Sequence, residues 1–512
     1  MNADILFIVP AFSPSFKEES IGTLMLTKIL KLNGYNAQIL RYWEVTTKFN
    51  DYNNFSVKLV NRILNINPKI VSFYCRCSEY HICIDVSSKL KEWNKKVKIV
   101  YGGPQAELVA KESMEIFNFI DYICCSEGET TIVPLLKLII DHSISEKDIK
   151  GLTYRDSNNK IMQNELPSLL DDSYQNENYY YDLVPAVVYK NSHIIPVDVG
   201  RGCPFSCTFC STKTFWKRHF RLRDIDNTIN EIEYVINTYG IKRFDLKHDL
   251  FTASRTRIIE FCDRIKERKL DIEWYCDSRI DTIDEKLIDI MLSAGVKSFF
   301  FGIESGSPRI QKRIKKELKL DRCETIIKYC LTKKIKVMAS FIYGFPEETE
   351  EDLRMTLSLM NRLKLLGCNI QVNVCSIQNG TELYEDYKKF LFPSTDMLDK
   401  NLYFGYSELE SLINNTPSVF VNFYDYPNPL RAEFKYLSIF INIFYANLDL
   451  TKRCLDIESD IILMYRLFCR FFISELRQHT LEILNLSLEK RHRLYLQKQE
   501  VFYSSLVRGY FR

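Results

Sequence analysis

The sequence alternates short runs of apolar and β-branched residues with amphipathic segments, and it does so in two separate series. Strands that alternate with helices pair in parallel, because each helix carries the chain back to the same edge of the sheet. The first series predicts five strands: Asp4–Val9, Asn36–Arg41, Lys69–Tyr74, Val97–Tyr101 and Ile120–Cys124. The second predicts six strands: Ile194–Gly200, Ile241–Lys247, Ile272–Cys276, Lys297–Ile303, Lys336–Ile342 and Asn369–Cys375. We therefore predict an α/β protein in which a Rossmann-like, doubly wound domain precedes a partial TIM-type barrel of six βα units.

Composition and period divide the 512 residues into four regions. Residues 1–153 carry the first series and residues 194–385 the second. Between them, residues 154–193 are rich in Asn, Asp, Ser and Tyr and lack a long period, which predicts a connector. Residues 386–512 have a helical, aromatic-rich pattern with a basic run at its end. This pattern predicts a helical C-terminal region and indicates no role for it.

Charge and hydropathy argue against several classes of function. The net charge is +3, from 69 basic and 66 acidic residues, so no overall field attracts nucleic acid and we expect no such partner. No apolar run reaches the roughly 18 to 20 residues that span a bilayer, and Met1–Pro10 does not resemble a signal peptide. We therefore expect a cytoplasmic protein without a membrane anchor. Its 16 cysteines are then expected to be reduced, and a cluster of them marks a metal or redox centre.

One cysteine cluster follows directly after the first strand of the second series. Cys203, Cys207 and Cys210 stand at spacings of four and three in a loop that Gly200 and Gly202 open. Three thiolates on such a loop suit a soft metal centre. A structural zinc needs a fourth ligand, and no Cys or His lies at finger spacing. A [4Fe-4S] cube held by three cysteines keeps one iron open to an outside ligand, and three buried core cysteines are the plainest alternative.

At these residues the chain resembles the radical S-adenosylmethionine (SAM) superfamily, whose signature is C-x3-C-x-aromatic-C after the first strand of a partial barrel. The aromatic position is Phe209. The resemblance implies that Cys203, Cys207 and Cys210 ligate a [4Fe-4S] cluster, that Phe209 lies at the cofactor site, and that SAM chelates the fourth iron. It also implies reductive cleavage of SAM to methionine and a 5′-deoxyadenosyl radical, which abstracts hydrogen from an unactivated carbon.

Four later strand ends resemble further motifs of this superfamily, in the family's order. The resemblance implies that Asp249 contacts the SAM amine and that Arg279 pairs with the SAM carboxylate. It places Glu304 and Ser305 near the ribose, and Gly344, in a Gly-Phe-Pro-Glu-Glu-Thr run, near the adenine. The acid usual before Asp249 is a histidine here, so only Asp249 carries over. For each polar side chain taken singly, a helix cap or an ion pair is the alternative.

The first domain resembles the cobalamin-binding domain that precedes the barrel in a large group of radical SAM enzymes. The residues that carry this resemblance follow the fourth and fifth strands: Gly102, Gly103, Glu127 and Gly128. The resemblance implies that these residues contact a corrin. Gln105 replaces the histidine common after Gly-Gly-Pro, and no Asp-x-His-x-x-Gly motif offers a cobalt ligand. A degenerate domain without cobalamin is therefore the alternative.

The combined resemblance predicts an enzyme that uses SAM, a [4Fe-4S] cluster and cobalamin to modify an unactivated carbon by C-methylation. The expected partners are a small-molecule or peptide substrate, such as a natural-product intermediate, and an electron donor such as flavodoxin or ferredoxin. One alternative is a cyclase or rearrangement enzyme without methyl transfer. Another is a methylthiotransferase in which Cys75, Cys77 and Cys83 hold a second cluster. A third is a non-catalytic sensor, which would not need the ordered SAM motifs.

Overall fold

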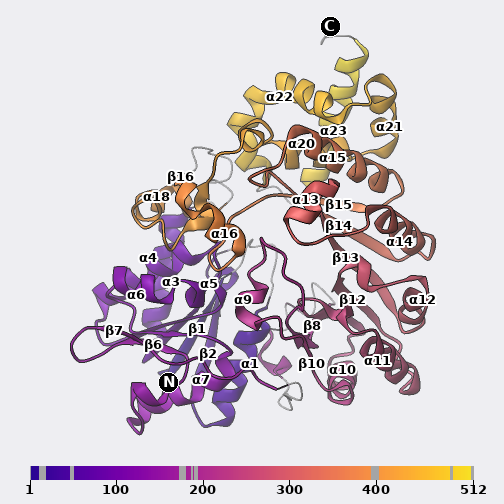
Figure 1. The fold of residues 1–512 in the computed structure, drawn as a ribbon. Coiled ribbons are helices and arrows are strands. Elements are labelled where there is room, and N and C mark those ends of the chain that lie inside the picture. The colour runs from indigo at the N-terminus through magenta and orange to yellow at the C-terminus, as the bar shows by residue number, and fades with distance from the viewer. Residues whose placement is uncertain are drawn as a thin grey trace.

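A computed structural model describes residues 2–10, 19–46, 51–171, 180–185, 188, 194–393, 403–484 and 488–508, without the side chains of residues 473–488. Figure 1 shows two α/β domains side by side, with the last helices of the chain over one end of the second domain. Within these residues, no helix is long and apolar enough to cross a membrane. The α/β class, the parallel sheets and the helical C-terminal region are as predicted.

The first sheet contains seven strands in the order β2-β1-β3-β4-β5-β6-β7. Its first five strands pair in parallel and follow the doubly wound order, in which the chain switches direction between β1 and β3. The strands are β1 (Ile5–Val9), β2 (Ala37–Arg41), β3 (Ile70–Tyr74), β4 (Lys98–Gly102), β5 (Tyr122–Cys124), β6 (Leu152–Arg155) and β7 (Ile161–Gln163). The helices are α1 (Ile21–Leu32), α2 (Tyr42–Val45), α3 (Tyr52–Ile66), α4 (Tyr80–Trp93), α5 (Pro104–Leu108), α6 (Ala110–Ile116) and α7 (Gly128–Leu136).

The last two strands of this sheet extend it beyond the five strands that the sequence predicts. β6 pairs with β5 and β7 pairs with β6, both antiparallel. The turn between them is closed by Asp156, whose Oδ1 accepts hydrogen bonds from the backbone N–H groups of Asn158 and Lys160, both at 2.9 Å. Strands of three or four residues are too short to show a hydrophobic period in the sequence. With a polar turn between them, the segment therefore has the sequence pattern of a connector.

The second sheet contains six parallel strands in the sequential order β15-β14-β13-β12-β11-β8. It is open between β8 and β15 in the part of the chain that the structure describes. The strands are β8 (Ile195–Asp198), β11 (Arg243–Lys247), β12 (Glu273–Ser278), β13 (Val296–Glu304), β14 (Lys336–Tyr343) and β15 (Asn369–Val374). The helices are α9 (Thr212–Trp216), α10 (Ile225–Tyr239), α11 (Arg255–Glu267), α12 (Glu285–Ser293), α13 (Pro308–Arg313), α14 (Leu320–Thr332) and α15 (Glu350–Leu365). A short antiparallel pair, β9 (Gly200–Arg201) and β10 (Arg221–Leu222), flanks the cysteine loop.

The C-terminal quarter is divided between the two domains rather than forming one separate unit. Tyr406 and Ile413 of α18 (Tyr406–Asn415) belong to the core of the first domain, where α18 packs on α4. The later helices pack on the barrel, with α20 against β15 and α22 against α15. The elements of this quarter are α16 (Glu382–Tyr387), β16 (Phe392–Pro393), α18, β17 (Tyr424–Asp425), α19 (Pro429–Glu433), α20 (Leu437–Phe444), α21 (Leu448–Ile457), α22 (Ile461–Leu484) and α23 (Leu488–Val507).

A buried ion pair fixes the start of the barrel. Arg223 pairs with Glu231 on α10, with 2.7 Å between Nη1 and Oε2, and neither side chain is exposed to solvent. The Tyr181 hydroxyl donates to the other carboxylate oxygen at 2.5 Å, and Arg223 also donates to the carbonyl of Asp198 at the end of β8. This pair therefore ties α10 to the strand from which the cysteine loop departs.

We expect Glu231→Ala to destabilise the protein strongly. The change leaves the Arg223 guanidinium buried without its carboxylate, which typically costs about 3 to 5 kcal/mol. Chemical denaturation should show this loss. Glu233→Ala is the matched control on the same helix, because the Glu233–Arg268 pair lies at the surface and should cost less than about 1 kcal/mol. Equal losses in the two variants would show that the buried pair contributes no more to stability than the surface pair.

Candidate functional site

A cavity of about 720 Å3 lies between the carboxyl ends of the first sheet's strands and the rim of the second sheet. The first domain contributes Val9 and Ser72, at the switch point between β1 and β3, where ligands of doubly wound sheets bind. The second sheet contributes Asp249 and Asp277. Burial raises the pKa of Asp277 to about 6. The cavity thus joins the ligand-binding edges of both sheets.

All four residues predicted to contact a corrin line this cavity: Gly102, Gly103, Glu127 and Gly128. A Cβ atom on Gly102 would meet no other atom within 4 Å, so its backbone faces open space. Gly103 has a φ of +95°, and a Cβ there would lie 2.9 Å from Cδ2 of Tyr74. A side chain at position 103 is therefore excluded both by the backbone conformation and by crowding.

The carboxylate of Glu127 is engaged by the barrel. Its Oε1 lies 2.6 Å from Nη1 of Arg201, and its Oε2 lies 3.0 Å from Nη1 of Arg221. The backbone N–H of Leu170 also donates to Oε2. Arg201 reaches Glu129 as well, and although burial raises the pKa of Glu129, this guanidinium lowers it below the ordinary value. Glu127 lines the cavity, but its negative charge is neutralised by arginines of the second domain and so links the two domains.

The three predicted cluster ligands lie together on the loop between β9 and α9. Cys203, Cys207 and Cys210 are all partly exposed. Burial, with smaller contributions from the neighbouring Cys210 and Cys207, raises the pKa of the Cys203 thiol to about 11. Within the described residues, no three His, Cys, Asp or Glu side chains converge as ligands of a single metal ion.

Glycine and one carboxylate shape this loop. Gly202 has a φ of +92°, and a Cβ there would overlap the carbonyl oxygen of His219. A Cβ on Gly200 would overlap the carbonyl of Arg221 on the paired strand. Asp249, the predicted amine contact, accepts a hydrogen bond of 2.7 Å from the backbone N–H of Gly202. Asp249 is thus directly bonded to the cysteine loop.

The histidine before Asp249 is neutral and structural. The Nδ1 atom of His248 accepts from the backbone N–H of Leu250 at 2.8 Å, so Nε2 carries the proton and donates to the Arg221 carbonyl at 2.9 Å. Burial lowers its pKa to about 4. His248 therefore supports the β9–β10 pair and does not replace the missing acid.

Arg279, predicted to pair with the SAM carboxylate, lies against the cysteine loop. Its Nη1 is 3.8 Å from Sγ of Cys207, and its guanidinium carbon lies 4.0 Å from the centre of the Phe205 ring. Asp281 holds the guanidinium through both carboxylate oxygens, at 2.7 and 3.0 Å. The positive charge is thus fixed beside a predicted cluster ligand.

Glu304 sits at a strained point of β13. It has a φ of +68°, which is unusual for a residue other than glycine, and the strand register shifts beside it. Its Oε1 lies 2.6 Å from Nζ of Lys316, in a pair that is almost fully buried. A Cβ at Gly302 would overlap this pair. Lys316 belongs to no motif in the sequence and is not among the predicted residues.

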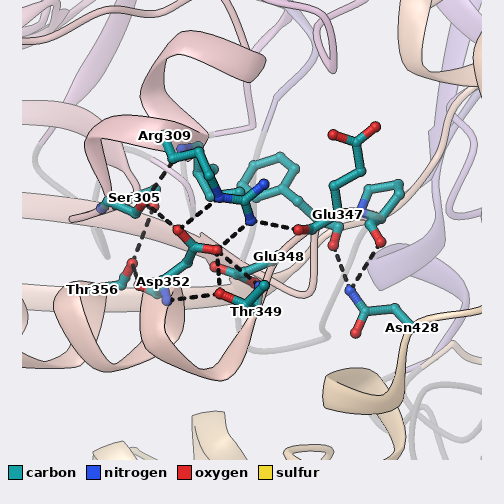
Figure 2. A network of polar contacts seen from close by, with 12 residues as sticks. Ser305, Arg309, Glu347, Glu348, Thr349, Asp352, Thr356 and Asn428 are labelled. Carbon is teal, nitrogen blue, oxygen red and sulfur yellow. Dashed lines mark hydrogen bonds and ion pairs between the residues drawn. The ribbon is translucent and has the colours of Figure 1, made fainter.

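Ser305 belongs to a polar network that fixes the ends of α13 and α15 (Figure 2). Its hydroxyl is 3.1 Å from Oγ1 of Thr356. Asp352 accepts from Ser307, Thr349 and Arg309, and although burial opposes them, these groups hold the pKa of Asp352 well below its usual range. Ser305 is therefore bonded to α15, while Ser307 and Thr349 cap α13 and α15.

The loop after β14 begins at Gly344, predicted to lie near the adenine. The backbone N–H of Gly344 donates to Oε2 of Glu348, whose Oε1 has no hydrogen-bond partner among the described residues. Burial raises the pKa of Glu348 to about 8. Phe345 of this loop lies beside Phe209, with ring centres 6.0 Å apart. This contact brings the predicted adenine loop to the cysteine loop.

The cysteines of the second-cluster alternative lie in the first domain. Cys75 and Cys83 are buried in its core, and Cys77 is partly exposed. Burial raises the pKa of Cys77 to about 11. The buried pair therefore packs as core residues do, and these thiols line no part of the cavity.

Residues 197–360 match the model of the radical SAM superfamily. An uncharacterized methyltransferase of Pyrococcus horikoshii is 31% identical over 326 residues, which cover 63% of this chain and 70% of that protein. An anaerobic magnesium-protoporphyrin IX monomethyl ester cyclase of Cereibacter sphaeroides is 28% identical, over 58% of this chain and 50% of the cyclase's own length. The solved structure of the cobalamin-dependent SAM radical enzyme OxsB with aqua-cobalamin bound has a similar fold, with a TM-score of 0.67, 14% identity and coverage of 99% of this chain and 80% of OxsB. From these matches, the chain belongs to the radical SAM superfamily.

Proposed function

We propose that this chain is a cobalamin-dependent radical SAM enzyme that methylates an unactivated carbon of a natural-product intermediate or a peptide. The observation that carries the proposal is the cavity of about 720 Å3 between the two domains. It sets the Gly102–Gly103 turn opposite the barrel rim, where Asp249 is bonded to the cysteine loop. OxsB, which has a similar fold, binds aqua-cobalamin, and this supports assigning the cavity to a corrin.

The cysteine loop suits a [4Fe-4S] cluster in its chemistry. Three neighbouring thiols on a glycine-shaped loop match a cube with one open iron, whose three thiolates bind three different iron atoms. In this proposal Cys203, Cys207 and Cys210 hold the cluster. The cluster and SAM supply a radical that abstracts hydrogen, and the corrin supplies the methyl group. An electron donor such as flavodoxin or ferredoxin provides the reducing electron.

The surrounding residues orient SAM in this proposal. Arg279 offers a fixed positive charge beside Cys207, which suits the SAM carboxylate. The carboxylates of Asp249 and Glu304 provide acceptors for the SAM amine and ribose. The ammonium group of Lys316 provides a donor. The strained backbone of Glu304 supports a functional role, because strain of this kind is retained mainly at binding and active sites.

A cyclase or rearrangement enzyme is the second candidate function. The relative from Cereibacter sphaeroides, named as a cyclase, is 28% identical over 313 residues. Both candidates need the same cluster and the same SAM contacts. They differ in products, because methyl transfer consumes a second SAM and releases S-adenosylhomocysteine.

The cluster assignment predicts about four irons per chain after anaerobic reconstitution. Cys203→Ala, Cys207→Ala and Cys210→Ala should each remove most of this iron. Cys262→Ala and Cys330→Ala are the controls, since both thiols are buried in the barrel core. Iron analysis and the visible absorption of the cluster provide the measurement. Full iron content in the three loop variants would rule out this assignment.

The enzyme assignment predicts that reconstituted protein, given reductant and SAM, produces 5′-deoxyadenosine and methionine. A Cys203→Ala protein should produce neither above background. With cobalamin present, the methyltransferase proposal also predicts S-adenosylhomocysteine, measured by mass spectrometry in the same reaction. Production of 5′-deoxyadenosine alone under these conditions would favour the cyclase candidate.

The corrin assignment predicts that Gly103→Trp abolishes cobalamin binding. Position 103 has a left-handed backbone and no room for a Cβ, so an indole there would fill the wall of the cavity. Purification from cobalamin-fed cells and a visible corrin spectrum provide the measurement. Iron content should stay at the wild-type level, which separates loss of the corrin from loss of the fold. Stoichiometric corrin in Gly103→Trp would contradict the assignment.

A further inference from the structure

The loop after β14 is bonded by a segment that lies far away in the sequence. We call residues 419–431, which follow α18 and include the start of α19, the strap. The Tyr426 hydroxyl donates to the carbonyl of Gly344. Nδ2 of Asn428 donates to the carbonyl of Phe345 (Figure 2). Nδ2 of Asn428 also lies 3.5 Å from the carbonyl of Pro346. Three successive carbonyls of the loop thus face strap donors.

The strap donors are rigid and shielded from water. Tyr426 is 1% exposed and Asn428 is 7% exposed. The Oδ1 atom of Asn428 accepts from the backbone N–H of Leu430 at 2.8 Å, so the amide also caps α19 and its orientation is fixed. Arg431 stacks 4.5 Å from the centre of the Tyr426 ring and donates to the carbonyl of Cys375 at the end of β15. Removal of one of these donors therefore leaves a loop carbonyl without its protein hydrogen bond in a largely buried site.

A hydrogen bond within the loop holds its other edge. The N–H of Gly344 donates to the buried carboxyl group of Glu348, while its carbonyl accepts from Tyr426. Gly344 has a φ of +76°, and a Cβ there would lie 2.9 Å from Cγ of Arg431. The loop backbone is therefore held both by its own Glu348 carboxyl group and by the strap.

The same strap is also bonded to the first domain. Nδ2 of Asn422 donates to the carbonyl of Cys77 at 3.2 Å. Gln105, which replaces the usual histidine of the corrin-side turn, donates to the carbonyl of Val419 at 2.9 Å. The strap thus carries two similar asparagine bonds, one to each domain, and only the Asn428 bond reaches the loop after β14.

We propose that Tyr426 and Asn428 are positioning residues for SAM, which act by holding the backbone of the Gly344–Pro346 loop in its binding conformation. This inference rests on the proposed function, in which that loop lies near the adenine. Neither side chain needs to touch SAM, because their proposed role is to hold the loop, whose buried Phe345 ring packs beside Phe209. The C-terminal quarter then completes the cofactor site of the barrel.

The test compares Asn428→Ala and Tyr426→Phe with Asn422→Ala in the full-length protein, reconstituted anaerobically. Each of the first two changes removes a buried donor to the loop, so the Kd for SAM in equilibrium dialysis should rise roughly 3- to 10-fold. Iron content should not change. In 5′-deoxyadenosine formation, the KM for SAM should rise while kcat changes less. Asn422→Ala removes a bond to the first domain only, and its Kd for SAM should equal that of the wild type.

The results separate this inference from the proposed function. If wild-type protein with full iron binds no SAM, the proposed function fails. If wild type binds and cleaves SAM but Asn428→Ala and Tyr426→Phe bind it equally well, only the positioning role is overturned. An equal rise in Asn422→Ala also overturns it, because the strap then acts through general stability. Tyr426→Phe keeps its ring and the Arg431 stacking, so it carries the test even if Asn428→Ala does not fold.

Discussion

The two-sided ion pair of Glu127 is the interaction on which the cavity depends. Its carboxylate lies between the guanidinium groups of Arg201 and Arg221, which flank the cysteine loop on β9 and β10. A buried carboxylate of this kind is compensated only while its partners are present, and loss of one leaves an unpaired charge in a low-dielectric interior. Together with the Arg201–Glu129 pair, this charge-compensated contact therefore holds the turn after β5 against the barrel rim.

Most of the fold follows from local patterns in the sequence. The five parallel strands of the first sheet and the six of the second are predicted by alternating apolar periods, and the helices by their glycine stops. The pattern fails at β6 and β7, because strands this short, joined by the turn at Asp156, have no period. It also fails for α18, whose Tyr406 and Ile413 pack on the first domain although the whole barrel intervenes in the sequence. Such placement depends on tertiary contacts that no local period encodes.

The candidate site also contains residues that the sequence predicts and residues that only the packing reveals. The spacing of Cys203, Cys207 and Cys210, and the glycines at 102 and 103, carry a signal that can be seen in the sequence. Lys316 carries none, because it is paired with Glu304 only through the strained end of β13 and the space left by Gly302. The sequence predicts Glu127 as a ligand contact, whereas its engagement with two arginines depends on the packing of two domains. Sequence motifs thus identify candidate cofactor contacts but not how the protein groups pair with one another.

The distance in sequence between the strap and its loop has a consequence during synthesis of the chain. Tyr426 follows Gly344 by 82 residues. At a ribosomal rate of roughly 5 to 20 residues per second, the loop emerges about 4 to 16 s before the hydroxyl that clamps it. For that interval the loop after β14 lacks its hydrogen bonds from Tyr426 and Asn428, while the bond between Gly344 and Glu348 lies within the part already made. Translation speed through residues 345–426 therefore sets how long the nascent site stays unclamped.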